Sequence, residues 1–370
     1  MAGLRPARSI CALSRDGEST LDLRKSNPPL NDPLNSKIPV AVIGAGAFGR
    51  NHARVYRDLE QQGEPVRLAA VVDAEGIRAQ AVASEFGAEA FSSIDEMLTR
   101  ARVQAASVAV PTTAHLSAAR ELMHAGVDVL IEKPLAATLE EADELIRVAR
   151  HSGRVAQAGH LERFNPAVQA TLALLNRPMF FEVHRLSVFT PRSLDIDVVL
   201  DLMIHDLDVV LAFTNSPVRE IRAVGLPILS PKVDIANVRM EFESGCIANF
   251  TASRVSTERV RKLRFFQPRQ YISIDYSRQD VLVFTVEPPG NAGGFPQIGV
   301  TKPPVLQEEP LRAELRSFLH AVRRRESPTV SLEEGRRALA VALDILEAIR
   351  RHSSGAGLDA LTAAEMPRSR

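Results

Sequence analysis

Net charge, cysteine and long apolar runs are the features that this sequence lacks. Its 45 lysines and arginines balance 45 aspartates and glutamates, so no excess charge attracts it to nucleic acid or to an anionic membrane. The two cysteines, Cys11 and Cys246, are too few for a disulfide framework or a zinc site of clustered cysteines. No apolar run is long enough to span a membrane. We therefore expect a cytoplasmic protein with no nucleic-acid partner, no membrane insertion and no metal in its chemistry.

At 370 residues the chain is too long for one hydrophobic core of ordinary size. Its 45% apolar and 24% charged content are typical of a globular protein. We expect two domains, one at 37–158 and one at 159–352. Both ends are expected to be disordered. Segment 1–36 mixes arginines with acids around an apolar piece too short for a signal peptide, and 353–370 is similarly irregular.

An apolar run from Val40 to Ile43 leads directly into a turn rich in glycine, and a helical pattern follows to about Glu60. A strand, a tight turn and a helix N-terminus in this order are typical of a dinucleotide site. The first glycine permits the bend, the second lets a pyrophosphate approach the backbone, and the third allows close packing of helix on strand. We therefore expect cofactor contacts from Gly44, Ala45, Gly46, Ala47, Phe48 and Gly49.

Segments of strand pattern alternate with segments of helical pattern up to Ala158. Such alternation predicts a doubly wound parallel sheet of the Rossmann type, which binds its ligand beyond the carboxyl ends of the strands. After Gly159 the pattern changes to extended segments, and two helices are expected at 310–325 and 331–350. We expect there an α+β domain with a large, mostly antiparallel sheet, formed by 179–188, 218–226, 236–242, 246–254, 261–266, 271–276 and 281–287.

Asp73 ends the second apolar strand segment, which begins at Val66. At this place a dinucleotide fold presents a carboxylate to the hydroxyls of the adenosine ribose. A carboxylate there repels a 2′-phosphate, so the sequence favours NAD over NADP as cofactor. The alternative is an acid that only caps the following helix.

Two further turns follow expected parallel strands, one at Pro111 and one at Glu132-Lys133-Pro134. Because the carboxyl ends of parallel strands meet at one edge, we expect the nicotinamide end of the cofactor to contact Pro111, Thr112, His115, Glu132 and Lys133. The Lys133 ammonium can hydrogen-bond a substrate hydroxyl and stabilise the oxygen as it becomes a carbonyl. The alternative is a surface lysine paired with Glu132.

The segment 197–213 is apolar at nearly every position outside one polar stripe. At helical spacing this stripe contains Asp197, Asp201, His205 and Asp208. An otherwise apolar helix is buried, so the stripe faces a cleft or a hydrogen-bonded network. Asp201, one turn before His205, can orient the imidazole and raise its pKa, as a general base for an alcohol requires. A metal site on Asp201 and His205 and a purely structural His–Asp pair are the alternatives.

Four other polar residues are candidates for substrate binding. Arg163 and Asn165 lie at the junction of the two expected domains, where the alternative is a turn held by salt bridges. Arg185 and Arg192 flank a predicted loop and could meet a diphosphate through bidentate contacts. Together with the lysine and the Asp–His pair, they form the expected substrate site.

The sequence resembles the Gfo/Idh/MocA family of sugar and cyclitol oxidoreductases. The resemblance extends from about Lys37 to Arg350, and its motifs are the glycine turn, Glu132-Lys133-Pro134, the run from Gly159 to Pro166, and Asp201-x-x-x-His205-Asp206. It implies that the motif lysine and histidine act at the carbinol and that the Lys–Pro bond is cis. It also implies a homo-oligomer, a dimer or a tetramer, formed through the open face of the second sheet.

Within that family the chain is most similar to enzymes that oxidise UDP-N-acetylglucosamine at C3. This implies a sugar-nucleotide substrate, a 3-keto product and a place in the formation of diamino sugars for lipid A. His205, held by Asp201, would take the proton, Lys133 would contact the same oxygen, and the hydride would pass to C4 of NAD+. The alternatives are an enzyme for myo-inositol or a free sugar, a redox-assisted glycosidase, and a non-catalytic NAD-binding sensor.

Overall fold

The computed structural model describes residues 36–190, 194–287 and 296–355. Of these, the N-terminal residues form a six-stranded sheet with the order β3-β2-β1-β4-β5-β6, in which every pair of neighbours is parallel. Its strands are β1 (Ile38–Ile43), β2 (Val66–Val72), β3 (Glu89–Phe91), β4 (Ala105–Val108), β5 (Asp128–Glu132) and β6 (Ala156–Gly159). The predicted Rossmann sheet is confirmed, with β3 as an added strand too short to show a pattern in the sequence.

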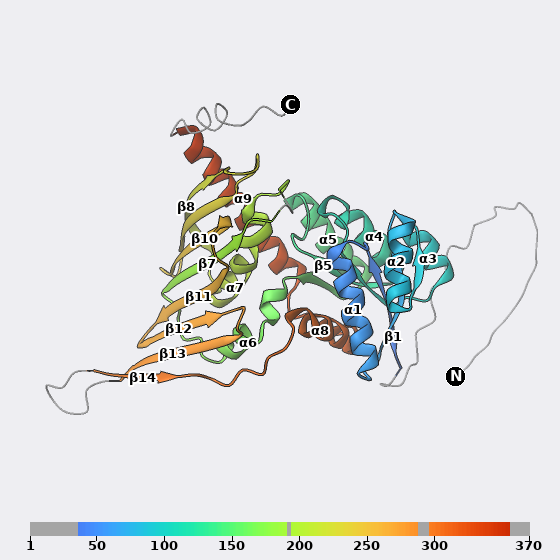
Figure 1. The fold of residues 1–370 in the computed structure, drawn as a ribbon, viewed down its shortest axis with the longest axis horizontal. Coiled ribbons are helices and arrows are strands. Elements are labelled where there is room, and N and C mark those ends of the chain that lie inside the picture. The colour runs from blue at the N-terminus through green and yellow to red at the C-terminus, as the bar shows by residue number, and fades with distance from the viewer. Residues whose placement is uncertain (1–35, 191–193, 288–295, 356–370) are drawn as a thin grey trace, which may run out of the picture. The chain divides into compact units, whose positions relative to one another are not determined.

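The helices of this half alternate with its strands, as expected. They are α1 (Ala47–Gln61), α2 (Gly76–Phe86), α3 (Ile94–Arg100), α4 (His115–His124) and α5 (Leu139–Ser152), with a short 3₁₀ turn, η1 (Thr112–Ala114), before α4. Figure 1 shows β1 and β5 of the parallel sheet among the helices α1 to α5. The side chain of Thr138 accepts the Glu141 N–H at 3.2 Å and so caps α5. Gly153, in the left-handed conformation, ends the same helix.

A second sheet of eight strands follows in the order β14-β13-β12-β11-β7-β10-β9-β8. All its neighbours are antiparallel except β7 and β10, which are parallel. The strands are β7 (Phe180–Val188), β8 (Val218–Leu226), β9 (Ile235–Phe242), β10 (Ile247–Ser256), β11 (Val260–Gln267), β12 (Gln270–Asp275), β13 (Asp280–Glu287) and β14 (Gln297–Thr301). The predicted mostly antiparallel sheet is confirmed, and β14 is a strand that the sequence patterns did not indicate.

Helices pack on one face of this second sheet, where β strands, α7 (Ile204–Thr214) and α9 (Leu332–Gly355) share one apolar core. The short turn η2 (Leu161–Phe164) and the unpredicted helix α6 (Pro166–Leu172) connect the two sheets. Ser331 and Glu334 cap α9 reciprocally: the Ser331 N–H donates to the Glu334 carboxylate at 2.9 Å and the Glu334 N–H donates to Ser331 Oγ at 3.2 Å. These two bonds form a capping box at the start of the helix expected at 331–350.

Two C-terminal segments return to the first sheet. Helix α8 (Pro310–Arg324) packs on α1, and its Leu315 and Phe318 belong to the core between β1, β2 and α1. Gly335 of α9 lies so close to Ala158 that a Cβ at this glycine would be 2.7 Å from the Ala158 Cβ. The two halves therefore share core residues, and the division at 158/159 stays a prediction about domains.

Helix α8 also buries a carboxyl group. Glu314 is fully buried, and neither of its carboxylate oxygens has a hydrogen-bond partner in the described part of the chain. Burial raises the pKa of Glu314 well above its usual value, and the nearby charges of Glu132 and Asp208 raise it further. The native state therefore favours the protonated form of this side chain.

We expect Glu314→Gln to make stability less dependent on pH. The unfolded chain releases the Glu314 proton above about pH 4.3, whereas the native state retains it. The wild-type free energy of unfolding should therefore fall as the pH rises from there toward the raised pKa, by at most about 1.4 kcal/mol per pH unit. Urea unfolding across this range measures the slope. Glu326→Gln, at an exposed position after α8, is the control, and parallel curves for wild type and Glu314→Gln would contradict the expectation.

Candidate functional site

A cleft of about 680 Å³ lies at the carboxyl ends of β4 and β5, the edge at which a doubly wound sheet binds ligands. Its wall comes from widely separated parts of the chain: the start of α1, the turns after β4 and β5, the segment before α7, the β8–β9 connection and α9. The predicted site residues that line it are Phe48, Pro111, Thr112, His115, Glu132, Lys133 and Asp201.

The glycine turn has the close contacts that its sequence predicts. Gly44 has a φ of +96°, and a Cβ there would be 2.6 Å from the Ala109 carbonyl oxygen. A Cβ on Gly49 would be 1.7 Å from the Gly44 carbonyl oxygen, so helix and strand approach closely here. Gly46, by contrast, has open space where a Cβ would stand, and it begins α1 without a side-chain cap. An uncapped helix N-terminus beside open space fits the pyrophosphate of a dinucleotide.

Asp73 lies beside this turn. Its Oδ2 accepts the Ala45 N–H at 2.7 Å, and its Oδ1 accepts the Glu75 N–H at 2.9 Å, just before α2 begins. Arg78 Nη1 is 3.5 Å from the same Oδ2. The carboxylate thus joins the glycine turn to the residue before α2, which has no side-chain cap, and the contact of Asp73 with a ribose stays a prediction.

Lys133 follows β5 and precedes Pro134 in a cis peptide bond, as the resemblance implied. Its Nζ donates to the Asp201 carbonyl oxygen at 2.8 Å and is 3.4 Å from Asp201 Oδ1. The alternative pairing with Glu132 is wrong, because the Glu132 carboxylate is buried against His52 Nε2 at 2.8 Å. The side chain of Lys133 is 9% exposed, so its ammonium is held at the cleft and not in bulk solvent.

His115 lines the cleft, as expected, and its ring contacts backbone carbonyl groups. Its ring nitrogens lie 3.0 Å from the Val110 carbonyl oxygen and 3.1 Å from that of Pro134. Burial lowers the pKa of His115, so the ring is favoured in its neutral form. His115 therefore links the turn after β4 to the turn after β5 at the edge of the cleft.

The Asp201–His205 segment differs from the prediction. It begins with a π-helical turn, η3 (Val199–Met203), in which the Ile204 N–H bonds the Val199 carbonyl oxygen five residues earlier. The wider turn changes the direction of the side chains before α7, and Asp201 contacts Lys133 instead of His205. His205 Nδ1 is buried without a hydrogen-bond partner among the described residues. The prediction that Asp201 orients His205 through a hydrogen bond is therefore wrong for this structure.

The predicted direction of the His205 pKa shift is also wrong. Burial lowers the pKa of His205 well below its usual value, and the positive charge of Lys133 lowers it further. The ring does not line the cleft itself, but it is close enough to Lys133 to respond to that ammonium. The structure thus contains a neutral imidazole behind a charged lysine.

The remaining members of the polar stripe point to different partners. Asp197 accepts the Val233 N–H at 2.9 Å and lines the cleft, while buried Asp208 is 3.4 Å from Arg163 Nη1. A regular helix would have kept these aspartates on one face. The burial of α7 itself is confirmed, since nearly all its residues are inaccessible to solvent.

Three expected substrate ligands are used inside the protein instead. Arg163 also donates to Glu334 at 2.7 Å, and Asn165 caps α6 by accepting the Ala167 N–H at 3.1 Å. Neither lines the cleft, so the alternative of a salt-bridged junction describes them better.

Arg185 is 3% exposed and is held by two carboxylates. It donates to Asp206 through Nε at 2.5 Å and Nη2 at 3.0 Å, and to Glu162 at 3.0 Å. Arg185 is therefore not available to a diphosphate. A buried cation needs its partner carboxylates, and leaving either of them unpaired would be unfavourable. Arg192, the fourth candidate, lies outside the described residues.

The sequence patterns missed several cleft residues, because they become neighbours only through the tertiary fold. Leu339 comes from α9 and Lys232 from the connection between β8 and β9, each remote in sequence from the glycine turn. Asp195 and Leu200 lie in the segment before α7. Lys232 carries no motif around it that would have distinguished it from an ordinary surface lysine.

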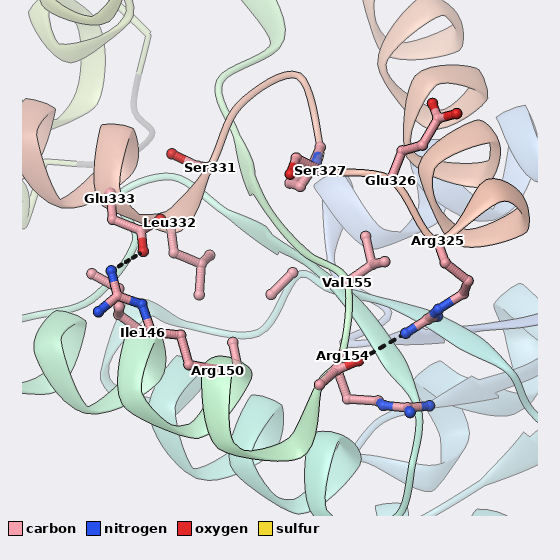
Figure 2. A pocket seen from close by; sticks show the side chains of 14 residues that line it. Ile146, Arg150, Arg154, Val155, Arg325, Glu326, Ser327, Ser331, Leu332 and Glu333 are labelled. Atoms are coloured by element: carbon pink, nitrogen blue, oxygen red, sulfur yellow. Dashed lines mark hydrogen bonds and ion pairs between the residues drawn. The ribbon is translucent and has the colours of Figure 1, made fainter.

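A second cavity of about 440 Å³ lies near the opposite ends of the parallel strands (Figure 2). Its arginines are already paired: Arg150 with Glu333 at 2.8 Å, and Arg325 with Asp128 at 2.5 Å and with the Gly153 carbonyl oxygen at 2.8 Å. This cavity lies next to the start of β6, away from the carboxyl ends of the strands, so the cleft at Lys133 is the candidate site.

The described residues contain neither a cluster of metal ligands nor a helix that could span a membrane. No group of three or more His, Cys, Asp or Glu side chains there is arranged to hold a metal ion. None of the helices there is both long and apolar enough to cross a membrane.

Comparison with known families matches both halves of the chain. Residues 38–160 match the model of the oxidoreductase family with an NAD-binding Rossmann fold, and residues 178–272 match the GFO/IDH/MocA C-terminal domain. These two matches correspond to the two sheets described above.

Individual relatives of this chain are also oxidoreductases. A UDP-N-acetylglucosamine 3-dehydrogenase of Acidithiobacillus ferrooxidans is 38% identical over 83% of this chain and 96% of its own length. A solved structure of that enzyme from the same organism superposes with a TM-score of 0.78 at 37% identity, covering 85% of this chain and 97% of the other. An inositol 2-dehydrogenase of Rubrobacter xylanophilus is 30% identical over 52% of this chain and 56% of its own.

The family expected from Glu132-Lys133-Pro134 and the Asp201–His205 motif is thus confirmed. A glycine turn that fits a dinucleotide, a lysine at the end of β5 and a neighbouring imidazole agree with that family's chemistry. The chain belongs to the Gfo/Idh/MocA family of oxidoreductases, and its cofactor is of the nicotinamide dinucleotide type.

Proposed function

We propose that this protein oxidises a secondary alcohol of a sugar nucleotide with NAD, and that the substrate is UDP-N-acetylglucosamine oxidised at C3. The observation that carries the proposal is the Lys133 ammonium, held at the cleft beside the neutral ring of His205. The choice of substrate is based on the similarity to the UDP-N-acetylglucosamine 3-dehydrogenase, which matches this chain over nearly the whole length of that enzyme. Its 3-keto product is the kind of intermediate that an aminotransferase would convert to a diamino sugar, and lipid A is the destination that we propose.

The residues act on the substrate hydroxyl in complementary ways. We assign the general base to His205, because its buried Nδ1 has no hydrogen-bond partner among the described residues and its lowered pKa favours the unprotonated ring, which can accept the hydroxyl proton. Lys133 donates a hydrogen bond to the same oxygen and stabilises negative charge on it as the C–O bond becomes a carbonyl. When bound, the nicotinamide ring of NAD supplies the acceptor for the hydride that leaves the carbon.

Asp201 acts through Lys133 in this proposal. Its carbonyl and carboxylate oxygens fix the position of the ammonium, which would otherwise rotate freely on a long side chain. We place Asp201 as a positioning residue for the lysine, in place of the role toward His205 that the sequence suggested.

The proposed cofactor site uses the glycine turn and Asp73. Gly46 leaves room for the pyrophosphate, and the N-terminus of α1 offers its free N–H groups. The Asp73 carboxylate supports NAD because its charge repels a 2′-phosphate. Phe48, Pro111 and Thr112 line the cleft between the glycine turn and Lys133, so we propose them as cofactor contacts.

We also propose a cytoplasmic homo-oligomer. One face of the second sheet exposes large apolar residues, which monomeric proteins rarely gather on one surface: Phe266, Leu282, Val286, Ile298 and Val300. The buried free thiol of Cys246 suits a reducing compartment.

Substitution of the two reacting groups tests the assignment. We expect Lys133→Met and His205→Asn each to lower kcat for UDP-N-acetylglucosamine oxidation by about 100-fold or more, because each removes a proton-handling group. The measurement is NADH formation with UDP-N-acetylglucosamine, free N-acetylglucosamine and myo-inositol in parallel. Lys37→Met, which removes an exposed lysine paired with Glu60, is the matched control. Near-normal turnover in both variants would show that the chemistry lies elsewhere.

The cofactor preference depends on Asp73. We expect Asp73→Ser to raise the ratio of kcat/KM for NADP to that for NAD by about tenfold or more, because it removes the repelling charge and releases Arg78. Overall activity should also fall, since Ala45 loses its acceptor, so the ratio is the informative quantity. Asp95→Ser, at an exposed position in α3, should leave the ratio unchanged. An unchanged ratio for Asp73→Ser would contradict the proposed role.

A further inference from the structure

The cleft contains only two lysines and no arginine among its described lining residues. One is Lys133, whose ammonium is held by Asp201 at the reacting end. The other is Lys232, in the connection between β8 and β9. Lys232 is exposed, and within the described part of the chain its ammonium has no hydrogen-bond or ion-pair partner. A free cation in this cleft is available to an anionic part of a ligand.

The backbone that carries Lys232 is held in a defined turn. Asp234 Oδ2 accepts the N–H groups of Ile228 at 2.8 Å, Leu229 at 2.6 Å and Ser230 at 2.8 Å. The hydroxyl oxygen of Ser230 accepts the Lys232 N–H at 3.2 Å. One buried carboxylate thus organises the whole connection, and Lys232 stands at a fixed place on an exposed turn.

The same turn is fastened to the segment that leads into the reacting site. The Val233 N–H donates to Asp197 Oδ1 at 2.9 Å, and the Val198 N–H donates to the Val233 carbonyl oxygen at 2.8 Å. Val198 directly precedes η3, which carries Asp201. The backbone at Lys232 is therefore fastened to the segment that carries Asp201, so Lys232 and the Lys133–Asp201 pair belong to one wall of the cleft.

We propose that Lys232 binds the diphosphate of the substrate and so selects sugar nucleotides over free sugars and polyols. The inference rests on the proposed function, which supplies the sugar of the substrate. Lys232 takes the place of the buried Arg185 as the residue expected to bind the diphosphate. A lysine ammonium is a compact point charge with three donors, suited to phosphate oxygens that are not held in one bidentate geometry. No carboxylate of the described residues forms an ion pair with Lys232: among the aspartates that line the cleft, Asp201 is paired with Lys133, Asp197 accepts a backbone N–H, and Asp195 is exposed to solvent.

The test compares Lys232→Met with wild type in two independent assays. In turnover of UDP-N-acetylglucosamine we expect KM to rise about tenfold or more while kcat changes little, because a charge-assisted hydrogen bond remote from the reacting carbon is lost. In calorimetric titration with UDP, which cannot react, we expect the affinity to fall by a similar factor. Added NaCl should weaken UDP binding to wild type more than to Lys232→Met.

Two variants control the charge. Lys232→Arg should retain most of the UDP affinity, since it keeps the cation, and Lys37→Met should behave as wild type in both assays. Unchanged KM and unchanged UDP affinity in Lys232→Met would overturn the inference. If wild type fails to oxidise any sugar nucleotide, the proposed function is wrong, whereas UDP binding by wild type that is lost in Lys232→Met would still uphold the role of Lys232.

Discussion

The contact between Lys133 and Asp201 is the interaction on which the arrangement of the site depends. It joins the end of β5 in the parallel sheet to the π-helical turn before α7, and these segments are far apart in the sequence. Without it, a buried lysine would have no acceptor, which is unfavourable at 9% exposure. The same bond aims the ammonium into the cleft and places it near His205. The position of the Lys133 ammonium and the approach of the two segments thus depend on one contact.

Much of the fold was predictable from local patterns. Buried parallel strands are continuous apolar runs, and helix ends carry capping residues such as Thr138 and Ser331, so these elements follow from a few neighbouring residues. Strand β14 and helix α6 were missed, because a short exposed edge strand and a seven-residue helix have little periodicity. The glycine turn was predictable for the same local reason, since its strand, turn and helix follow one another in the sequence, whereas the approach of Ala109 to Gly44 is a tertiary contact.

The site was less predictable, because its side chains choose partners across the tertiary fold. The motifs indicated correctly that Lys133, Asp201 and His205 lie in one region. They could not show that Asp201 turns to the lysine, since a π-helical turn has no sequence signature of its own. Arg185 is an arginine near the expected site, yet Asp206 and Glu162 bind it inside the protein. Two carboxylates around one guanidinium can be recognised only when the strands and α7 have been brought together.

The π-helical turn before α7 has an evolutionary and engineering consequence. A turn of this kind contains one residue more than an α-helical turn, and such insertions are found at functional sites, where they change the direction of side chains without ending the helix. Loss of a single residue between Val199 and Met203 would make the helix regular. The chain segment before the deletion would then be rotated by about 100° about the helix axis relative to α7. The more regular helix would separate Asp201 from Lys133, so length tolerance in this segment should be close to zero.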